Sequence, residues 1–141
     1  MPTWQELATT SPYQTAVAVQ EALRAGNVQD ATEGLEELID ALSRSDRRAL
    51  ESHLVRLMQH IIKWTYQPDK RSRSWQNTIA NAREAIAEIQ EDTPSLTDDV
   101  IRLLWTRTLR KAHREAEGDM NQQVPSLPLT WDEVFTQDYS L

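Results

Sequence analysis

The chain has 141 residues, of which 39% are hydrophobic and 26% charged, with three glycines and a net charge of −7 at pH 7. This length is enough for one hydrophobic core, and the composition is typical of a helical globular protein rather than a disordered or fibrous one. The negative charge argues against attraction of the whole molecule to nucleic acid, and the lack of cysteine excludes disulfides, thiolate zinc sites and cysteine nucleophiles.

Two helices are expected in the first third of the chain. Pro12 after Ser11 fits the first position of a helix, which ends at Gly26-Asn27. Its apolar residues recur at helical spacing: Tyr13, Ala16, Val17 and Leu23. Asp30 and Glu33 form a variant capping box, which predicts the start of a short second helix with an acidic outer face. The apolar stripe of that helix is Leu35, Leu38, Ile39 and Leu42.

The helical pattern restarts around Ser43 to Ser45 and predicts the longest and most apolar helix, running toward Trp64. Its stripe contains Leu50, Leu54, Leu57, Met58 and Ile61. Pro68 cannot donate a backbone hydrogen bond and disfavours helical geometry at the residue before it, so we expect a turn at residues 67–69. Either Ser72 or Ser74 can cap the fourth helix. Steps of four and three predict the seam of an antiparallel bundle at Trp75, Ile79, Ala82, Ile86 and Ile89.

A fifth helix and a short capped turn complete the predicted elements. Ser95 with Asp98 offers a capping box after a break at residues 92–94, and Gly118 is expected to end the helix. The inward positions are Ile101, Leu104, Trp105, Thr108 and Ala112. Thr130 to Glu133 resembles a capped helical turn, and Trp131 and Phe135 are expected to hold the tail against the bundle.

The predicted fold class is therefore all-α: a compact bundle of about five helices with antiparallel neighbours and a short C-terminal helical turn. We expect one domain over residues 1–141, with a core at 11–118 and a docked tail at 119–141. The first residues have no basic lead, and the apolar runs are only a few residues long, which predicts neither a signal peptide nor a membrane span. We expect a soluble cytoplasmic protein.

The charges are divided unevenly along the chain. Residues 44–83 carry nine cations and three acids, a local charge of +6, so the remainder carries −13. The cations are Arg44, Arg47, Arg48, Arg56, Lys63, Lys70, Arg71, Arg73 and Arg83. Such a division indicates either a surface that binds an anion or a basic region that lies against acidic parts of the same fold.

The sequence resembles a bacterial family catalogued as domain of unknown function 29. The resemblance rests on Arg47-Arg48-Ala49-Leu50-Glu51, on the residues His60, Lys63-Trp64, Tyr66-Gln67-Pro68, Arg71-Ser72, Ser74-Trp75 and Thr78-Ile79, and on the closing run Leu129-Thr130-Trp131-Asp132-Glu133-Val134. It covers nearly the whole chain and implies a compact all-helical fold. It implies no activity, cofactor or partner.

The predicted turn after Lys63 is the candidate binding site. His60, Lys63, Tyr66 and Arg71 could hold a phosphate through charge-assisted hydrogen bonds, and the two neighbouring tryptophans could stack on a planar ligand. The complete candidate set is His60, Lys63, Trp64, Tyr66, Gln67, Lys70, Arg71, Arg73 and Trp75. A structural interpretation is also open, in which the tryptophans anchor the turn and the arginines pair with Glu36, Glu37 and Asp40.

Metal sites and nucleophiles receive little support. His53 and His60 are seven residues apart, about 10.5 Å along a helix, whereas zinc ligands each lie about 2 Å from the metal. The carboxylates Glu33, Glu36, Glu37 and Asp40 could share magnesium on one helix face, although a solvated acidic face explains them too. No glycine-rich phosphate loop or nucleophile elbow is present. We assign no catalytic residue and no cofactor.

Two functional hypotheses follow. The first is a non-catalytic cytoplasmic binding or adaptor protein that contacts a protein or an anionic ligand through the Lys63 to Trp75 turn. The second is a magnesium-dependent hydrolase of a phosphorylated small molecule, with the acidic helix at residues 33–40 as metal site and Lys63 or Arg71 holding phosphate. Association with a second copy of the chain is also open, because no residue pattern decides it.

Overall fold

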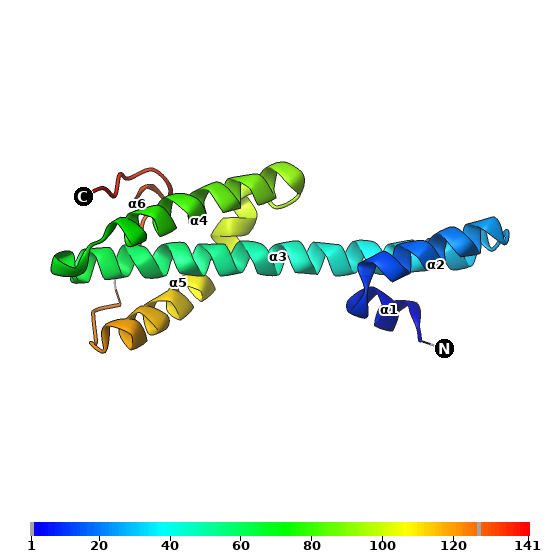
Figure 1. Ribbon diagram of the computed structural model, residues 1–141, viewed down its shortest axis with the longest axis horizontal. Coiled ribbons are helices and arrows are strands. Elements are labelled where there is room, and N and C mark those ends of the chain that lie inside the picture. The colour runs from blue at the N-terminus through cyan, green and yellow to red at the C-terminus, as the bar shows by residue number, and fades with distance from the viewer. Residues whose placement is uncertain (1, 127) are drawn as a thin grey trace. The chain divides into compact units, whose positions relative to one another are not determined.

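Helices account for all the regular structure in the described part of the chain, residues 2–126 and 128–141 of a computed structural model (Figure 1). The six α-helices found there are α1 (Trp4–Thr10), α2 (Pro12–Arg24), α3 (Val28–Tyr66), α4 (Arg73–Asp92), α5 (Asp98–Met120) and α6 (Trp131–Phe135), with a 3-10 helix, η1, at Pro68–Lys70. The described residues include no strand, which confirms the all-α fold class. The chain divides into two compact units, residues 1–48 and 49–141. Helix α3 contributes to both.

The predicted break near Ser43 to Ser45 is absent, and the two helices expected on either side of it are one continuous helix of 39 residues. Serine has only a modest helix penalty, and no proline or glycine stands in that stretch to interrupt the backbone hydrogen bonds. Asp30 is also not a cap. It lies in the first turn of α3, where its carboxylate accepts a hydrogen bond of 2.8 Å from Trp4 Nε1.

Unit 1, residues 1–48, begins with a helix that the sequence interpretation missed. Thr3 and Glu6 form a capping box at the start of α1, which is only seven residues long. The prediction for α2 is confirmed, because Ser11 accepts a hydrogen bond from the Gln14 backbone and Pro12 is the first helical residue. Gly26, with a positive φ of 83°, reverses the chain between α2 and α3.

The core of unit 1 is small. Its buried apolar residues are Ala8, Val19, Ala22, Ala31 and Leu38. The apolar positions of the predicted stripes are largely on the outside instead: Tyr13, Leu23, Leu35, Ile39 and Leu42 are all exposed. Because both sides of α2 and α3 carry apolar residues, the helical periodicity alone could not tell which side would be covered.

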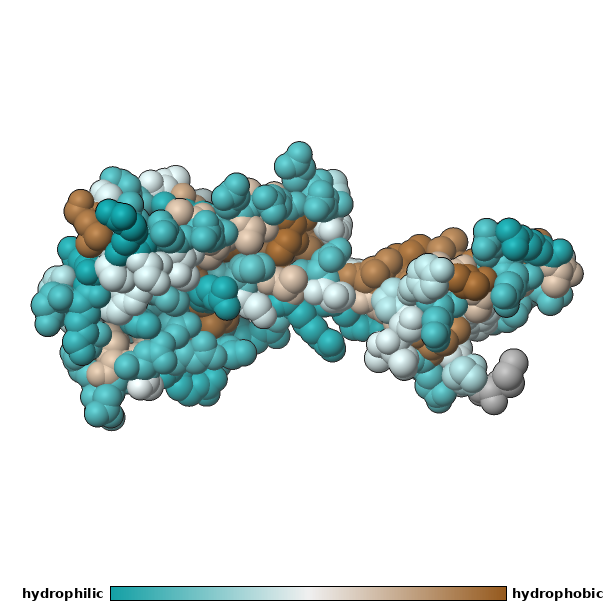
Figure 2. Space-filling model, in the orientation of Figure 1, coloured by the Kyte–Doolittle hydropathy of each residue, from teal (hydrophilic) through white to brown (hydrophobic). Residues whose placement is uncertain are grey.

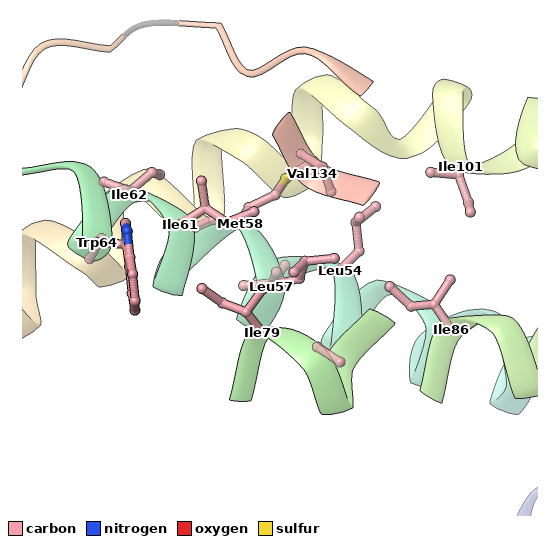
Figure 3. Close-up of a cluster of buried hydrophobic side chains, with 14 of the residues drawn as sticks. Leu54, Leu57, Met58, Ile61, Ile62, Trp64, Ile79, Ile86, Ile101 and Val134 are labelled. Carbon is pink, nitrogen blue, oxygen red and sulfur yellow. The ribbon is translucent and has the colours of Figure 1, made fainter. Parts of the chain in front are cut away.

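Unit 2, residues 49–141, contains the large hydrophobic core. The second half of α3 runs between α4 and α5, and its predicted stripe is fully buried (Figures 1 and 3). Ile79 and Ile86 reach this core from α4, Ile101 from α5 and Val134 from α6 (Figure 3). The bundle predicted for this part of the chain is therefore present.

Local capping signals explain most of the helix ends in unit 2. Ser72 caps α4 by accepting a hydrogen bond of 3.2 Å from the Trp75 backbone, which resolves the choice between Ser72 and Ser74. The predicted Ser95 cap is wrong, because Thr97 caps α5. The predicted end at Gly118 is also wrong: α5 continues to Met120 and stops at Asn121, which has a left-handed φ of 50°.

The C-terminal segment is attached to the core by aromatic and backbone contacts. Trp131 stacks on Trp105 with 5.6 Å between ring centroids, and Phe135 packs against both rings, as predicted. Thr130 and Glu133 form the predicted capping box of α6. Arg83 of α4 donates from Nε to the carbonyl oxygen of Val134 at 2.8 Å. These contacts hold α6 against α4 and α5.

Candidate functional site

The candidate segment forms the connection between α3 and α4. The last turn of α3 ends at Tyr66, and the three residues after Gln67 form η1. Within that short helix, the Lys70 backbone donates to the Gln67 carbonyl oxygen at 3.0 Å. The predicted turn is confirmed, and it follows from the missing N–H of Pro68 and from the restriction that proline places on the residue before it.

Arg71 fastens this turn to the end of α3. Its Nε donates to the Trp64 carbonyl oxygen at 2.9 Å, and its guanidinium carbon lies 4.9 Å from the centroid of the Trp64 ring. The last carbonyl groups of a helix lack partners within the helix, so this bond satisfies one of them. The side chain thus performs a structural task with one of its five N–H donors.

Lys63 makes internal contacts as well. Its Nζ forms an ion pair of 3.2 Å with Asp119 near the end of α5, and it lies 5.0 Å from the centroid of the Trp75 ring. Gln59 donates to the same Asp119 oxygen at 2.6 Å. The Lys63 side chain is only 13% exposed. One cation therefore links the last turn of α3 to both α4 and α5.

His60 and Trp64 also belong to the interior side of this region. His60 Nδ1 lies 2.9 Å from the Arg56 carbonyl oxygen, and burial lowers the pKa of this histidine below its usual value, with the positive charges of Lys63 and Arg56 acting in the same direction. Trp64 is 5% exposed and meets the Tyr139 ring edge-on, with the centroids 6.0 Å apart. Both side chains are placed to pack within unit 2.

Tyr66 borders a small cavity that its neighbours in the candidate set do not line. Together with Ile62, His113 and Leu129 it borders a cavity of about 90 Å³. His113 closes one side of that cavity, with its Nε2 2.9 Å from the Val124 carbonyl oxygen. This volume is well below the roughly 300 Å³ at which pockets for small organic ligands begin.

The outer part of the turn is basic and exposed. Lys70, Arg71 and Arg73 are all exposed, and within the described residues neither Lys70 nor Arg73 has an ion pair. Seven of the nine candidate residues therefore fall into two groups. His60, Lys63, Trp64 and Trp75 are buried or partly buried residues that fix the turn, whereas Lys70, Arg71 and Arg73 are exposed on it, and Arg71 also fastens the turn through its Nε.

The acidic residues considered for magnesium lie on the first half of α3, in unit 1. Glu33, Glu36 and Asp40 are exposed there, and Glu37 is partly exposed. Over residues 2–126 and 128–141, no group of three or more histidine, aspartate or glutamate side chains is arranged to hold a metal ion.

Several residues that organise the site have no signal in the local sequence. Asp119 accepts hydrogen bonds from both Gln59 and Lys63, and it is distant in the chain from the turn that it supports. Arg83 and Tyr139 likewise meet only through the fold, with the Arg83 guanidinium carbon 5.4 Å from the tyrosine ring centroid. Such pairs depend on which helix faces are in contact.

A sequence model of one protein family, Domain of unknown function DUF29, matches residues 12–140. The chain belongs to the DUF29 family. The DUF29 match includes α2 to α6 and therefore the whole turn with its supporting residues. Neither a curated protein nor a solved structure matches this DUF29 chain. Within its described residues, no helix combines the length and the apolar character needed to cross a membrane.

Proposed function

We propose that this DUF29 chain is a non-catalytic cytoplasmic binding protein that contacts an acidic segment of a partner protein through Lys70, Arg71 and Arg73. The observation that carries the proposal is the contrast between a firmly held turn and three exposed cations on it. Arg71 and Lys63 fasten the turn to α3 and α5. A surface that is already ordered loses less conformational entropy when it binds.

The donors of these cations suit carboxylates. Lys70 and Arg73 have no ion pair within the described part of the chain, and the bond from Arg71 to Trp64 uses only its Nε. The remaining guanidinium N–H groups can bind a carboxylate with two parallel hydrogen bonds. Three cations in four residues can thus receive several carboxylates of one acidic segment.

The net charge favours a short acidic segment over a long polyanion. The chain carries −7 overall, so a nucleic acid that extends beyond the turn would meet repulsion from the rest of the surface. An acidic peptide of a few residues would contact only the basic turn. This reasoning selects a protein segment as the ligand class.

A titration of the full chain with a labelled acidic peptide tests the proposal, with fluorescence anisotropy as the readout at low salt. The double variant Lys70→Ala and Arg73→Ala leaves the structural contacts of Arg71 in place and should weaken binding about tenfold. The matched control is Arg110→Ala with Arg114→Ala, which removes two exposed cations from α5. It should change the affinity less than about twofold.

Inorganic polyphosphate and single-stranded DNA serve as comparison ligands in the same titration. If both double variants weaken binding of the acidic peptide equally, the attraction is a general effect of charge, and a defined site is contradicted. A chain that fails to bind the peptide at all would also contradict the proposal.

A further inference from the structure

Unit 1 exposes more large apolar side chains than it buries. Four of them lie on α3 and form what we term the apolar stripe: Val28, Leu35, Ile39 and Leu42, with exposed fractions of 61%, 46%, 57% and 45%. At 3.6 residues per turn they fall within about 60° of the helix circumference and extend over about 21 Å. Figure 2 shows hydrophobic surface along this part of α3.

The neighbouring side of the same helix is already covered. Ala31 packs with Val19 and Ala22 of α2, and the Trp4 ring of α1 lies over Gly34. Helices α1 and α2 therefore cover one side of α3 and leave the apolar stripe beside it open. The chain has no cysteine to cross-link this small core, and burial of more apolar surface would stabilise it.

The charges of α3 indicate what covers the apolar stripe. From Val28 to Asp40 the helix has five acids and no base. From Ala41 to Arg48 it has three arginines and one acid. A second α3 laid in the same direction would set acid against acid, whereas the reversed direction sets the acidic part of each helix against the basic part of the other.

The residues at the edge of the apolar stripe fit this reversed arrangement. Glu36 and Arg47 lie on the same flank, each about 100° around the helix from the stripe. Glu36 lies six residues before Leu42, and Arg47 lies five residues after it. Both are exposed, and neither has an ion pair within the described residues. A twofold axis near Leu42 brings each Glu36 beside Arg47 of the other copy.

We propose that residues 35–48 of α3, which include the last three residues of the apolar stripe, form a dimer interface by packing antiparallel against the same residues of a second copy of the chain. Ile39 and Leu42 lie at its centre, and two Glu36 to Arg47 pairs border it. A different partner would need its own reversed charge pattern, which a second copy of this chain supplies automatically. The interface is separate from the basic turn.

Sedimentation velocity of the full chain tests the apolar part of the proposal. The wild-type chain should be dimeric at about 100 µM, and the double variant Ile39→Ser and Leu42→Ser should be monomeric. Leu103→Ser is the matched control, because Leu103 is an exposed leucine of α5, at 79%; this variant should remain dimeric. Circular dichroism checks that each variant stays helical. A monomeric wild-type chain, or a dimer that survives the double variant, would overturn the proposal.

Charge reversal tests the antiparallel direction. Glu36→Arg and Arg47→Glu should each raise the dimer dissociation constant at least about tenfold, since each places like charges together twice. Combining the two in one chain restores opposite charges and should return the constant to near the wild-type value. If the combined variant is weaker than either single variant, the two residues do not meet, and the antiparallel pairing is wrong.

Discussion

Arg71 stacks on the ring of Trp64 and also donates to the backbone oxygen of that same residue, at 2.9 Å. One side chain thus closes the end of α3 and fixes the turn that follows. Replacing it by alanine should lower the free energy of unfolding by about 1–2 kcal/mol, the sum of one hydrogen bond and one cation–π contact. Urea denaturation measures this loss.

Arg71→Lys is the informative companion variant, because lysine retains a cation for the ring and lacks the Nε donor. Arg71→Lys should lower the free energy of unfolding by roughly half as much as Arg71→Ala does. Lys70→Ala, one residue earlier and exposed, should change the unfolding free energy by less than about 0.5 kcal/mol. Equal losses for Arg71→Ala and Lys70→Ala would rule out the structural role of Arg71.

The two tryptophans of the candidate segment should differ in their contribution to stability. Trp64 is 5% exposed and belongs to the main core, so Trp64→Ala should cost about 3–5 kcal/mol. Trp75 is only partly buried, at the edge of that core, and Trp75→Ala should cost about half as much. Denaturation of both variants under identical conditions provides the comparison, and a larger loss for Trp75→Ala would contradict the packing.

Gly34 of α3 lies directly against the Trp4 ring of α1. A Cβ atom at this position would lie 2.7 Å from atoms of the Trp4 ring. Alanine normally favours a helix over glycine by about 1 kcal/mol, but here the ring would have to move and would strain its hydrogen bond to Asp30. We therefore expect Gly34→Ala to lower stability by about 1 kcal/mol.

Gly118 provides the control for that substitution. It also lies in a helix, and a Cβ atom there would meet nothing within 4 Å. Gly118→Ala should raise the thermal unfolding midpoint, whereas Gly34→Ala should lower it. A stabilising effect at both positions would mean that the Trp4 ring does not hold its place on α3.

The free energy of unfolding should fall as the pH is lowered, because of His60. Burial lowers the pKa of His60 in the folded chain, whereas the unfolded chain has the usual value near 6.5. The unfolded state therefore takes up the proton first, and the unfolding free energy falls as the pH decreases below about 6.5. His60→Gln should reduce this decline between about pH 7 and pH 5 in urea denaturation. Parallel pH profiles for the two proteins would be inconsistent with this effect.

The free energy of unfolding should also fall at alkaline pH, because of Tyr139. Burial raises the pKa of Tyr139 to about 12, and its hydroxyl donates to the Glu133 carbonyl oxygen at 2.7 Å. The folded state thus favours the neutral phenol, and stability that is present below about pH 10 is lost as the pH rises toward 12. Ultraviolet titration should show one tyrosine ionising late, and Tyr139→Phe should remove that step. At neutral pH this variant should cost about 1 kcal/mol.

Local signals in the sequence were enough to place the starts of α2 and α6 and to narrow the start of α4 to two serines. Ser11, Ser72 and Thr130 each cap a helix by accepting a hydrogen bond from the backbone N–H three residues further on, so a short stretch of sequence contains the whole interaction. The restart expected near Ser43 was wrong for a related reason. A serine that would suit a cap is also tolerated inside a helix when its neighbours continue the hydrogen bonds.

The contacts of the candidate site depend on residues far apart in the chain. Lys63 could be recognised as a cation at a helix end, but the position of its acceptor Asp119 follows only from the way α5 packs on α3. Similarly, the apolar spacing of Tyr13 and Leu23 indicated a helix correctly, while both side chains are exposed. Periodicity identifies an apolar side, and tertiary packing decides whether another element covers it.

The unequal cores along α3 have a consequence for hydrogen exchange. Its backbone ladder is continuous from Val28 to Tyr66, yet the large side chains of α3 that are fully buried all follow Arg48. Amides from Leu50 to Trp64 should open only when the main core unfolds, whereas those before Arg48 open with the smaller core of unit 1. The helix would then have an unbroken ladder of hydrogen bonds and yet show two different rates of amide exchange. The change in rate would fall near Arg48, where no hydrogen bond is missing.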